Sequence, residues 1–251
     1  MNNVFITSDL SISALNADEL YRNFPKIVQS GGYSCAINAE KLWHYGNGTL
    51  KAEVDNASLR VADGASIVII AKLSADHKIE KIDFPDLVVR YAAEYSLDLG
   101  LLGASREVNS AAVKNLIERF SSLNVKGISG FEPEDAWLRF LSKHFEDNIG
   151  IVLLGLGSPK QEQLAARLSV RFPNIFFVCC GGAIDGFAGR NPRAPLFVQK
   201  SYFEWLYRLL QNPRKRFNRI HRLMPAASLI MVLWLRSLLS RIGSRYQKFE
   251  K

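Results

Sequence analysis

Residues 151–195 read IVLLGLGSPKQEQLAARLSVRFPNIFFVCCGGAIDGFAGRNPRAP, and this stretch decides the fold. Two apolar runs, Ile151–Leu156 and Ile175–Cys180, each lead directly into a glycine. Short runs that are apolar throughout are typical of strands buried on both faces, as in a parallel sheet. The segment between the runs has the apolar spacing of an amphipathic helix, so the stretch predicts a strand–helix–strand unit.

The turn after the first run predicts how the helix begins. Gly155 and Gly157 allow a tight bend and a close approach of the backbone to a ligand. Ser158 suits the N-cap, Pro159 the first helical position and Gln161 the third, which together predict a capping box. The unpaired N–H groups of such a helix start can bind an anionic group. A well-capped crossover helix without any ligand explains the same residues, so both interpretations remain open.

The rest of the chain repeats this alternation of short apolar runs and helical segments. Further strands are expected at Val4–Thr7, Tyr33–Ile37, Asp98–Leu102, Val125–Ser129 and, after an Asp63-Gly64 turn, within Leu59–Leu73; helices are expected at residues 16–27, 39–45, 105–123 and 134–145. Residues 75–85 are polar and predict a loop. We therefore expect an α/β fold, namely a Rossmann-like, mostly parallel sheet with helices on both faces, followed by a C-terminal helical appendage. The expected division is a catalytic domain over residues 1–195 and a basic helical appendage over residues 196–251.

Charge is distributed unevenly along the 251 residues, whose formal net charge is +8. Residues 196–251 contain twelve Lys and Arg residues but only two acidic residues, whereas acidic residues slightly outnumber basic ones in the remainder. Such a basic segment is expected to meet an anionic surface, either nucleic acid or anionic lipid.

The three cysteines, Cys35, Cys179 and Cys180, show neither a disulfide framework nor the spacing of metal ligands, which favours a reducing cytoplasm. The N-terminus has no basic region followed by an apolar core, so no signal peptide is expected.

Three motifs occur in a fixed order in the C-terminal half of the sequence. They are GLGSPKQE at residues 155–162, GGAIDGFAGRNPRAP at 181–195 and EWLYRLLQNPRKR at 204–216. In this order and spacing they resemble the WecG/TagA/CpsF glycosyltransferase family, and the resemblance extends upstream over most of the chain. It implies transfer of a sugar from a UDP-sugar, with inversion, to a polyprenyl-diphosphate-linked acceptor in cell-surface polysaccharide synthesis. N-acetylmannosaminyl transfer is one implied activity, and hexosyl transfer such as glucosyl transfer in exopolysaccharide assembly is the alternative.

The resemblance implies the role of the carboxylate in the Asp63-Gly64 pair. Asp63 matches the aspartate that the family uses as the proposed catalytic base. An inverting transfer needs one carboxylate to remove the proton of the acceptor hydroxyl as that hydroxyl attacks the anomeric carbon. Without the resemblance, an Asp-Gly pair is more simply a plain turn.

The resemblance also implies binding residues. Those expected at the donor are Asn38, Lys81, Gly103, Gly157, Gln161 and Asp185, and those expected at the acceptor or its diphosphate are Arg190, Arg193, Arg208, Arg214, Arg216 and Arg219. Plainer roles stay open for three of them: Asn38 as a helix cap, Lys81 as a surface residue and Asp185 as a partner of an arginine within its loop. The sequence departs from the family at Ala36, where a threonine is usual, and at Phe84, where a glycine is usual. No Asp-x-Asp motif is present, so neither a metal nor another cofactor is expected.

The segment Leu223–Leu235 holds thirteen uncharged residues, fewer than the roughly twenty that span a bilayer. An apolar helix with a tryptophan and flanking arginines suits the membrane interface, with Leu229, Leu233, Trp234, Arg236 and Arg241 as the membrane residues. A core or oligomer helix is the alternative, and a homo-oligomer is possible. We expect a peripheral protein on the cytoplasmic face of the inner or plasma membrane. Helical spacing of the apolar residues argues against nucleic acid as a partner, although a non-enzymatic nucleotide or nucleic-acid binding module remains the hypothesis of another class.

Overall fold

The computed structural model describes residues 3–13, 16–75, 79–80, 82–145, 148–190 and 220–235. Its main sheet has six strands, β3 (Gly32–Ile37), β4 (Leu59–Ala62), β5 (Asp98–Gly103), β6 (Val125–Ile128), β7 (Gly150–Gly155) and β8 (Ile175–Cys179). They lie in the order β4-β3-β8-β7-β5-β6, and every neighbouring pair is parallel. The expected α/β fold with a parallel sheet is confirmed.

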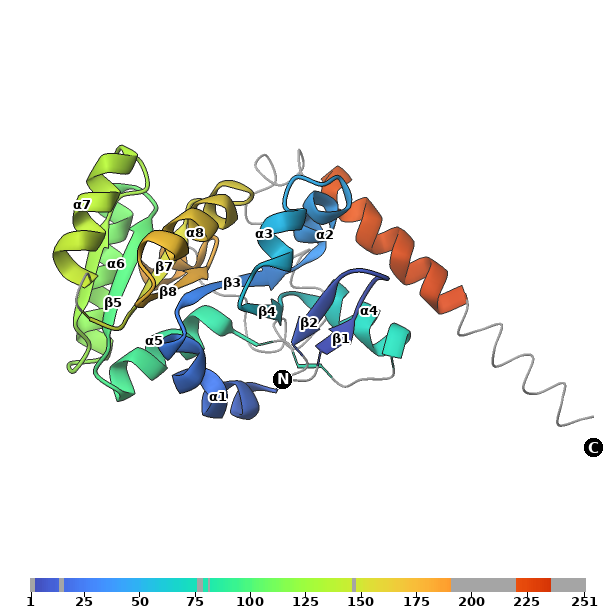
Figure 1. The fold of residues 1–251 in the computed structure, drawn as a ribbon, viewed down its shortest axis with the longest axis horizontal. Coiled ribbons are helices and arrows are strands. Elements are labelled where there is room, and N and C mark those ends of the chain that lie inside the picture. The colour runs from blue at the N-terminus through green and yellow to red at the C-terminus, as the bar shows by residue number, and fades with distance from the viewer. Residues whose placement is uncertain are drawn as a thin grey trace, which may run out of the picture.

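Helices cover both faces of this sheet (Figure 1). Their bounds are α1 Ala17–Gln29, α2 Ala39–Gly46, α3 Lys51–Asp55, α4 Ala65–Ala75, α5 Phe84–Glu94, α6 Arg106–Arg119, α7 Glu134–Phe145, α8 Lys160–Arg171 and α9 Ala183–Phe187. A separate cluster of buried apolar residues lies against each face of the sheet. One includes apolar residues of α2, α3, α7 and α8, and the other includes residues of α1, α5, α6 and α9. This arrangement confirms helices on both faces.

The central strand β7 explains why the fold-deciding run is apolar at every position. Val152 and Leu154 belong to the first cluster, whereas Ile151 and Leu153 belong to the second. Successive side chains of a strand point to opposite faces, and here both faces are covered by helices. An alternating apolar and polar pattern would leave polar side chains in one of the two cores.

The segment after Asp63-Gly64 is a helix, α4, and the predicted apolar strand there is wrong. Ile67, Ile70 and Ala71 are buried and share the first cluster. Their spacing of three and four residues places them on one side of a helix, whereas a strand would bury alternate residues. A short apolar run fits either element by composition alone, and the packing decides between them.

The predicted capping box at Ser158 is also wrong. The helix α8 begins at Lys160 with Pro159 as its N-cap, and no side chain caps it. Gln161 therefore falls at the second helical position, and its buried side chain bonds other partners. The peptide bond between Ser158 and Pro159 is cis.

Several shorter elements were not predicted. The strands β1 (Asn3–Phe5) and β2 (Ser11–Ser13) form an antiparallel pair in place of the single strand expected at residues 4–7. The pair lies beside β4, where the Arg60 Nε donates to the Ser11 carbonyl at 3.0 Å. The helices α3, α5 and α9 were not predicted either. α3 and α9 are each only five residues long, which is too short for a helical periodicity to be detected.

The described C-terminal segment packs on the α/β body along one side only. A 3-10 turn, η1 (Ile220–Leu223), leads into helical residues 224–235 (the orange-red helix in Figure 1). Arg222 forms an ion pair with Glu40 of α2, and the His221 ring meets the Trp43 ring edge to face at 5.7 Å. Ala226 is buried. Its neighbours at helical spacing, Leu229, Ile230 and Leu233, pack partly buried against the first cluster. In the part of the chain that the structure describes, no helix is long and apolar enough to cross a membrane.

Candidate functional site

The candidate catalytic residue lies at the carboxyl edge of the sheet. Asp63 directly follows β4, and Asn38 directly follows the neighbouring strand β3. The Asn38 Nδ2 donates to the Asp63 Oδ2 at 3.0 Å. The Asn38 Oδ1 accepts the Lys41 backbone N–H at 3.0 Å, which makes Asn38 the cap of α2. The expected cap role is confirmed, and the same side chain also orients the carboxylate.

Glycine backbones occupy the other half of the same edge. A Cβ placed on Gly103, at the end of β5, would lie 2.6 Å from the Gly155 carbonyl oxygen. A Cβ on Gly155, at the end of β7, would lie 3.0 Å from the carbonyl oxygen of Gly181. The three turns that follow β5, β7 and β8 therefore touch through backbone atoms. Gly157 has a φ of +78° and no atom within 4 Å of its Cβ position, so this turn borders open space.

The helices that leave these turns diverge. Buried residues of α8, which follows β7, belong to the first cluster, and buried residues of α6, which follows β5, belong to the second. Neighbouring parallel strands whose helices go to opposite faces open a crevice at their carboxyl ends, where doubly wound proteins bind ligands. Gly103 and Gly157 lie at these carboxyl ends.

Gln161, Glu162 and Lys41 form a buried polar cluster behind the edge, and sequence reasoning missed the last two. The Lys41 Nζ lies 2.9 Å from the Glu162 Oε1, and the Gln161 Nε2 donates to that same oxygen at 2.8 Å. Burial alone would lower the pKa of Lys41, but the charge of Glu162 and the hydrogen bond to it outweigh burial and raise that pKa. Lys41 lies in the first turn of α2 and Glu162 in the first turn of α8. A charged residue in the first turn of each helix was therefore the signal by which the sequence could have revealed the pair.

The loop after β8 contains α9 and two predicted residues. Asp185 is half-buried on α9, and its backbone carbonyl accepts the Arg190 N–H at 3.1 Å. Arg190 is exposed. The hydrogen bond from the Ser105 hydroxyl, foremost, and to a lesser extent the charge of Arg190 lower the pKa of Glu107 at the start of α6.

Eight other predicted residues lie outside the described part of the chain: Lys81, Arg193, Arg208, Arg214, Arg216, Arg219, Arg236 and Arg241. The described residues that follow Lys81 have structural roles rather than binding roles. Phe84, at the position of the family glycine, is buried with its ring edge to face against Phe24 at 5.8 Å. Asp86 is held by Arg90 and Arg119, each at 2.8 Å.

The two cysteines at the end of β8 lie in surroundings that disfavour the thiolate form. Burial raises the pKa of the Cys180 thiol to about 12 and raises the pKa of Cys179 as well. A thiol attacks or binds metal as the thiolate, which such a site disfavours. Among the described residues, no group of three or more His, Cys, Asp and Glu side chains is arranged to hold a metal ion.

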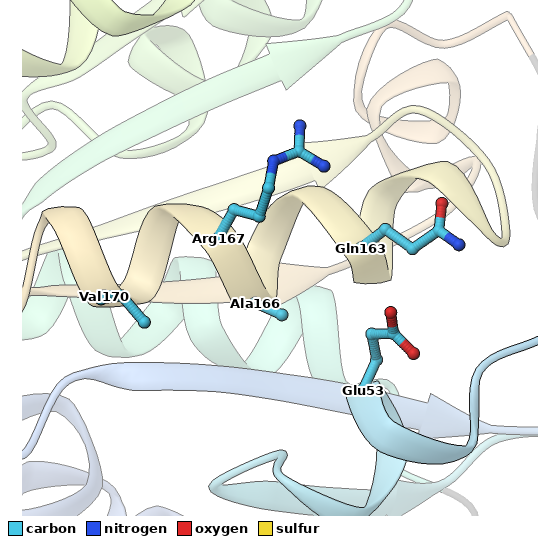
Figure 2. Close-up of a pocket in the computed structure, with 5 residues that line it drawn as sticks. All are labelled: Glu53, Gln163, Ala166, Arg167 and Val170. Atoms are coloured by element: carbon cyan, nitrogen blue, oxygen red, sulfur yellow. The ribbon is translucent and has the colours of Figure 1, made fainter.

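A surface depression of about 630 Å³ lies apart from this edge, between α3 and α8 (Figure 2). It is lined by Glu53, Gln163, Ala166, Arg167 and Val170. None of the predicted site residues lines it. Arg167 is engaged there by Glu134 through two contacts of 3.0 and 3.1 Å.

The fold defines a doubly wound α/β protein, a class that binds ligands at the carboxyl ends of its strands. The chain belongs to the glycosyl transferase WecG/TagA/CpsF family, whose family model matches residues 6–242. It is therefore a glycosyltransferase with a role in cell-surface polysaccharide synthesis. The resemblance derived from the three motifs is confirmed.

Proposed function

We propose that the protein transfers a sugar from a UDP-sugar to a polyprenyl-diphosphate-linked acceptor with inversion at the anomeric carbon, and that Asp63 is the catalytic base. The observation that carries the proposal is the hydrogen bond from Asn38 to Asp63, in line with the glycine turns along one edge of the sheet. A carboxylate and the glycine turns at the same carboxyl edge support the proposal, because doubly wound proteins bind their ligands at this edge.

The bond from Asn38 determines which oxygen of Asp63 reacts. It engages Oδ2 and leaves Oδ1 to accept the proton of the acceptor hydroxyl. As the proton moves to Oδ1, the hydroxyl oxygen bonds to the anomeric carbon, and the bond from that carbon to the diphosphate breaks on the opposite side. UDP leaves with the bonding electron pair, so the linkage inverts. Asp63 loses the proton to solvent afterwards.

The donor binds across the glycine turns. Gly103 and Gly157 let the nucleotide approach the backbone, and the start of α8 directs N–H groups at the diphosphate. Asn38 lies at this edge beside Asp63, whereas the buried side chain of Gln161 bonds Glu162 and Gly181 and supports the turn after β8 from behind. Asp185 and Lys81 complete the donor site. Arg190, Arg193 and the arginines at 208, 214, 216 and 219 neutralise the acceptor diphosphate.

The C-terminal helix places the acceptor site at a membrane surface. Residues 224–235 dock through Ala226, Leu229, Ile230 and Leu233, and the opposite side exposes Met224, Met231, Val232, Trp234 and Leu235. An exposed apolar stripe with a tryptophan suits insertion at the level of the lipid headgroups, and Arg236 and Arg241 add attraction to anionic lipid. Leu229 and Leu233 support the helix on the body, so the contact with lipid belongs to Trp234 and its exposed neighbours.

The test is a donor screen. The full chain is incubated with a panel of UDP-sugars and a short-chain lipid-diphosphate-linked acceptor, the product is weighed by mass spectrometry, and its anomeric configuration is read by NMR. We expect one product with an inverted linkage, and its mass distinguishes an N-acetylhexosaminyl from a hexosyl transfer. A retained configuration, or no product with any UDP-sugar, contradicts the proposal.

A further inference from the structure

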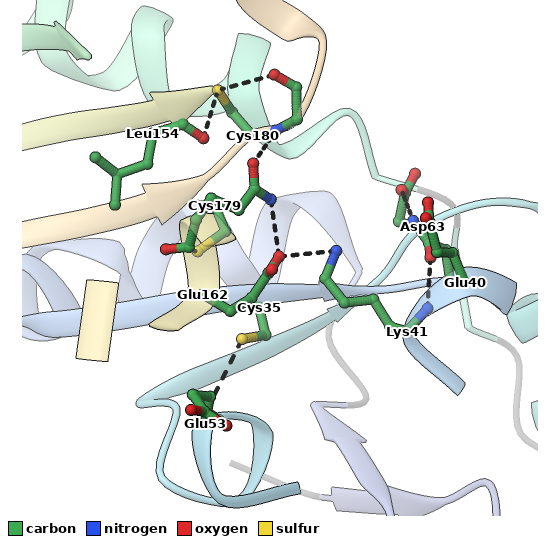
Figure 3. Close-up of polar contacts among 12 residues, drawn as sticks. Cys35, Glu40, Lys41, Glu53, Asp63, Leu154, Glu162, Cys179 and Cys180 are labelled. Carbon is green, nitrogen blue, oxygen red and sulfur yellow. Dashed lines mark hydrogen bonds and ion pairs between the residues drawn. The ribbon is translucent and has the colours of Figure 1, made fainter. Parts of the chain in front are cut away.

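A continuous path of hydrogen bonds connects the two halves of the carboxyl edge (Figure 3). On one side, Glu162 receives Lys41 at 2.9 Å and the Gln161 Nε2 at 2.8 Å, both on its Oε1. The Gln161 Oε1 then accepts the backbone N–H of Gly181 at 3.2 Å. This half of the path joins α2 and α8 to the turn after β8.

The other half of the path runs from Lys41 to the proposed base. The Lys41 backbone N–H donates to the Asn38 Oδ1, and the Asn38 Nδ2 donates to the Asp63 Oδ2, each at 3.0 Å. Lys41 thus contributes its backbone to one half and its ammonium group to the other. The complete path extends from Asp63 after β4 to Gly181 after β8.

The chemistry of the partners fixes the direction of both amides. The Glu162 carboxylate only accepts and the Gly181 N–H only donates, so Gln161 satisfies both in one orientation alone. Asn38 is fixed in the same way between the Lys41 N–H and the Asp63 carboxylate. A loss of charge at Glu162 would remove the strongest constraint on Gln161.

The stability of the core does not by itself account for this ion pair. The Lys41 and Glu162 side chains are 6% and 0% exposed, and a buried pair is often replaced by apolar residues of similar volume without loss of stability. The pair lies across the end of β8, because the strands before α2 and α8, β3 and β7, both neighbour β8 rather than each other. It therefore links two helices whose preceding strands are not hydrogen-bonded to each other.

We propose that Lys41 and Glu162 are positioning residues of the transfer reaction. Neither touches substrate. They fix the first turns of α2 and α8 relative to each other, and through Asn38 and Gln161 they set the spacing between the Asp63 carboxylate and the donor side of the edge. The inference rests on the proposed function for the role of Asp63. A displacement of about 1 Å between reacting groups can cost about a hundredfold in rate.

The main test is the double variant Lys41→Met/Glu162→Leu, which replaces the pair by apolar side chains of similar size. Three quantities are measured: the Tm, the hydrogen exchange rate of the Gly181 amide, and kcat and KM with the donor found in the screen. We expect a Tm near that of the wild type and a kcat about a hundredfold lower with a smaller change in KM. We also expect the Gly181 amide to exchange about fivefold faster, because Gln161, which accepts its N–H, loses the hydrogen bond to Glu162 that orients it. A Gly181 amide that exchanges at the wild-type rate overturns the proposal, and so does a wild-type kcat.

Glu162→Gln is the second variant, in case the double variant does not fold, because it preserves volume and removes only the charge. We expect faster Gly181 exchange and a lower kcat here too, and wild-type values of both overturn the proposal. The matched control is Glu134→Gln/Arg167→Gln, which removes an exposed ion pair between α7 and the same helix α8 and should leave all three quantities unchanged.

The exchange measurement separates the two proposals. It needs no substrate, so it reports on the path even if the wild-type protein turns over no UDP-sugar. Absent turnover in the wild type contradicts the proposed function, whereas unchanged Gly181 exchange in both variants contradicts the positioning role alone.

Discussion

The two halves of the carboxyl edge present different chemical groups, side chains in one half and glycine backbone in the other. After β3 and β4 the chain presents side chains, Asn38 and Asp63, that bond each other at 3.0 Å. After β5 and β7 it presents bare backbone, with Gly103 and Gly155 too close to admit a Cβ and with Gly157 beside open space. The sheet thus brings a carboxylate and glycine turns to one edge.

The difference separates two chemical tasks. Proton transfer needs a titratable group held in one orientation, which a strand end and a neighbouring amide provide. Binding of a diphosphate needs many N–H groups at close range, which glycine turns and helix starts provide. Substitutions in the first half should therefore lower kcat, and substitutions in the second should alter stability or donor KM.

The largest effect is expected for Asp63→Asn. The change keeps the shape and the contact with Asn38 but removes the base, so kcat should fall about 10²- to 10⁴-fold with little change in Tm. Steady-state transfer kinetics and thermal unfolding measure both. Asp135→Asn, an exposed aspartate on α7, is the control and should behave as wild type. Turnover near the wild-type rate would remove Asp63 from the mechanism and direct attention to Asp185.

A pair of alanine substitutions compares the closed and open glycines. Gly103→Ala puts a Cβ 2.6 Å from the Gly155 carbonyl oxygen, at a φ of +154°, so the two turns must separate and the Tm should fall by many degrees. Gly157→Ala meets no atom within 4 Å and costs only the strain of a positive φ, about 1 kcal/mol. If Gly157 faces the donor, the Gly157→Ala variant should also raise the KM for the donor. Equal loss of stability in both variants would contradict this comparison.

The exposed side of the C-terminal helix offers a third test. Met231→Ser/Trp234→Ala removes two exposed apolar side chains and leaves the docked residues intact. Since burial of each such side chain contributes about 1.5–3 kcal/mol, binding to anionic vesicles should weaken at least about tenfold while the Tm stays constant. Vesicle flotation measures binding. Val170→Ser changes a still more exposed apolar residue on α8 and should bind as wild type. Unchanged flotation of the double variant would place the membrane contact elsewhere.

The smallest effect is expected from pH. Burial, and then the charge of Arg222, lower the pKa of His44, with Glu40 opposing and Lys41 adding to the shift. A lowered pKa means that the unfolded chain takes up a proton first, near pH 6.5, so stability falls as pH drops from there toward the folded-state pKa. The Tm difference between pH 7 and pH 5 should be smaller in His44→Phe than in the wild type. An identical difference in both proteins would show that His44 contributes nothing to it.

Periodicity and turn residues were sufficient to predict most of the sheet. The runs that became β7 and β8, the Ser105 cap of α6 and the bounds of α7 were predicted within a residue or two. The run after Asp63-Gly64 was assigned to the wrong element, because an apolar segment of that length fits both periods until its partners are known. The same limit applies to Ser158, whose residue type favours a cap that the chain does not form.

The sequence by itself determined the α/β class, the family and the glycines at the strand ends, since these depend on local periodicity and on motifs contiguous in the chain. Only the tertiary structure decided that Asn38 orients Asp63, that the Gly103 and Gly155 backbones touch, and that Lys41 pairs with Glu162. The physical reason is the strand order. Parallel strands far apart in the sequence, β3 and β8 or β5 and β7, become neighbours in the sheet, and the contacts at their carboxyl ends exist only once that order forms.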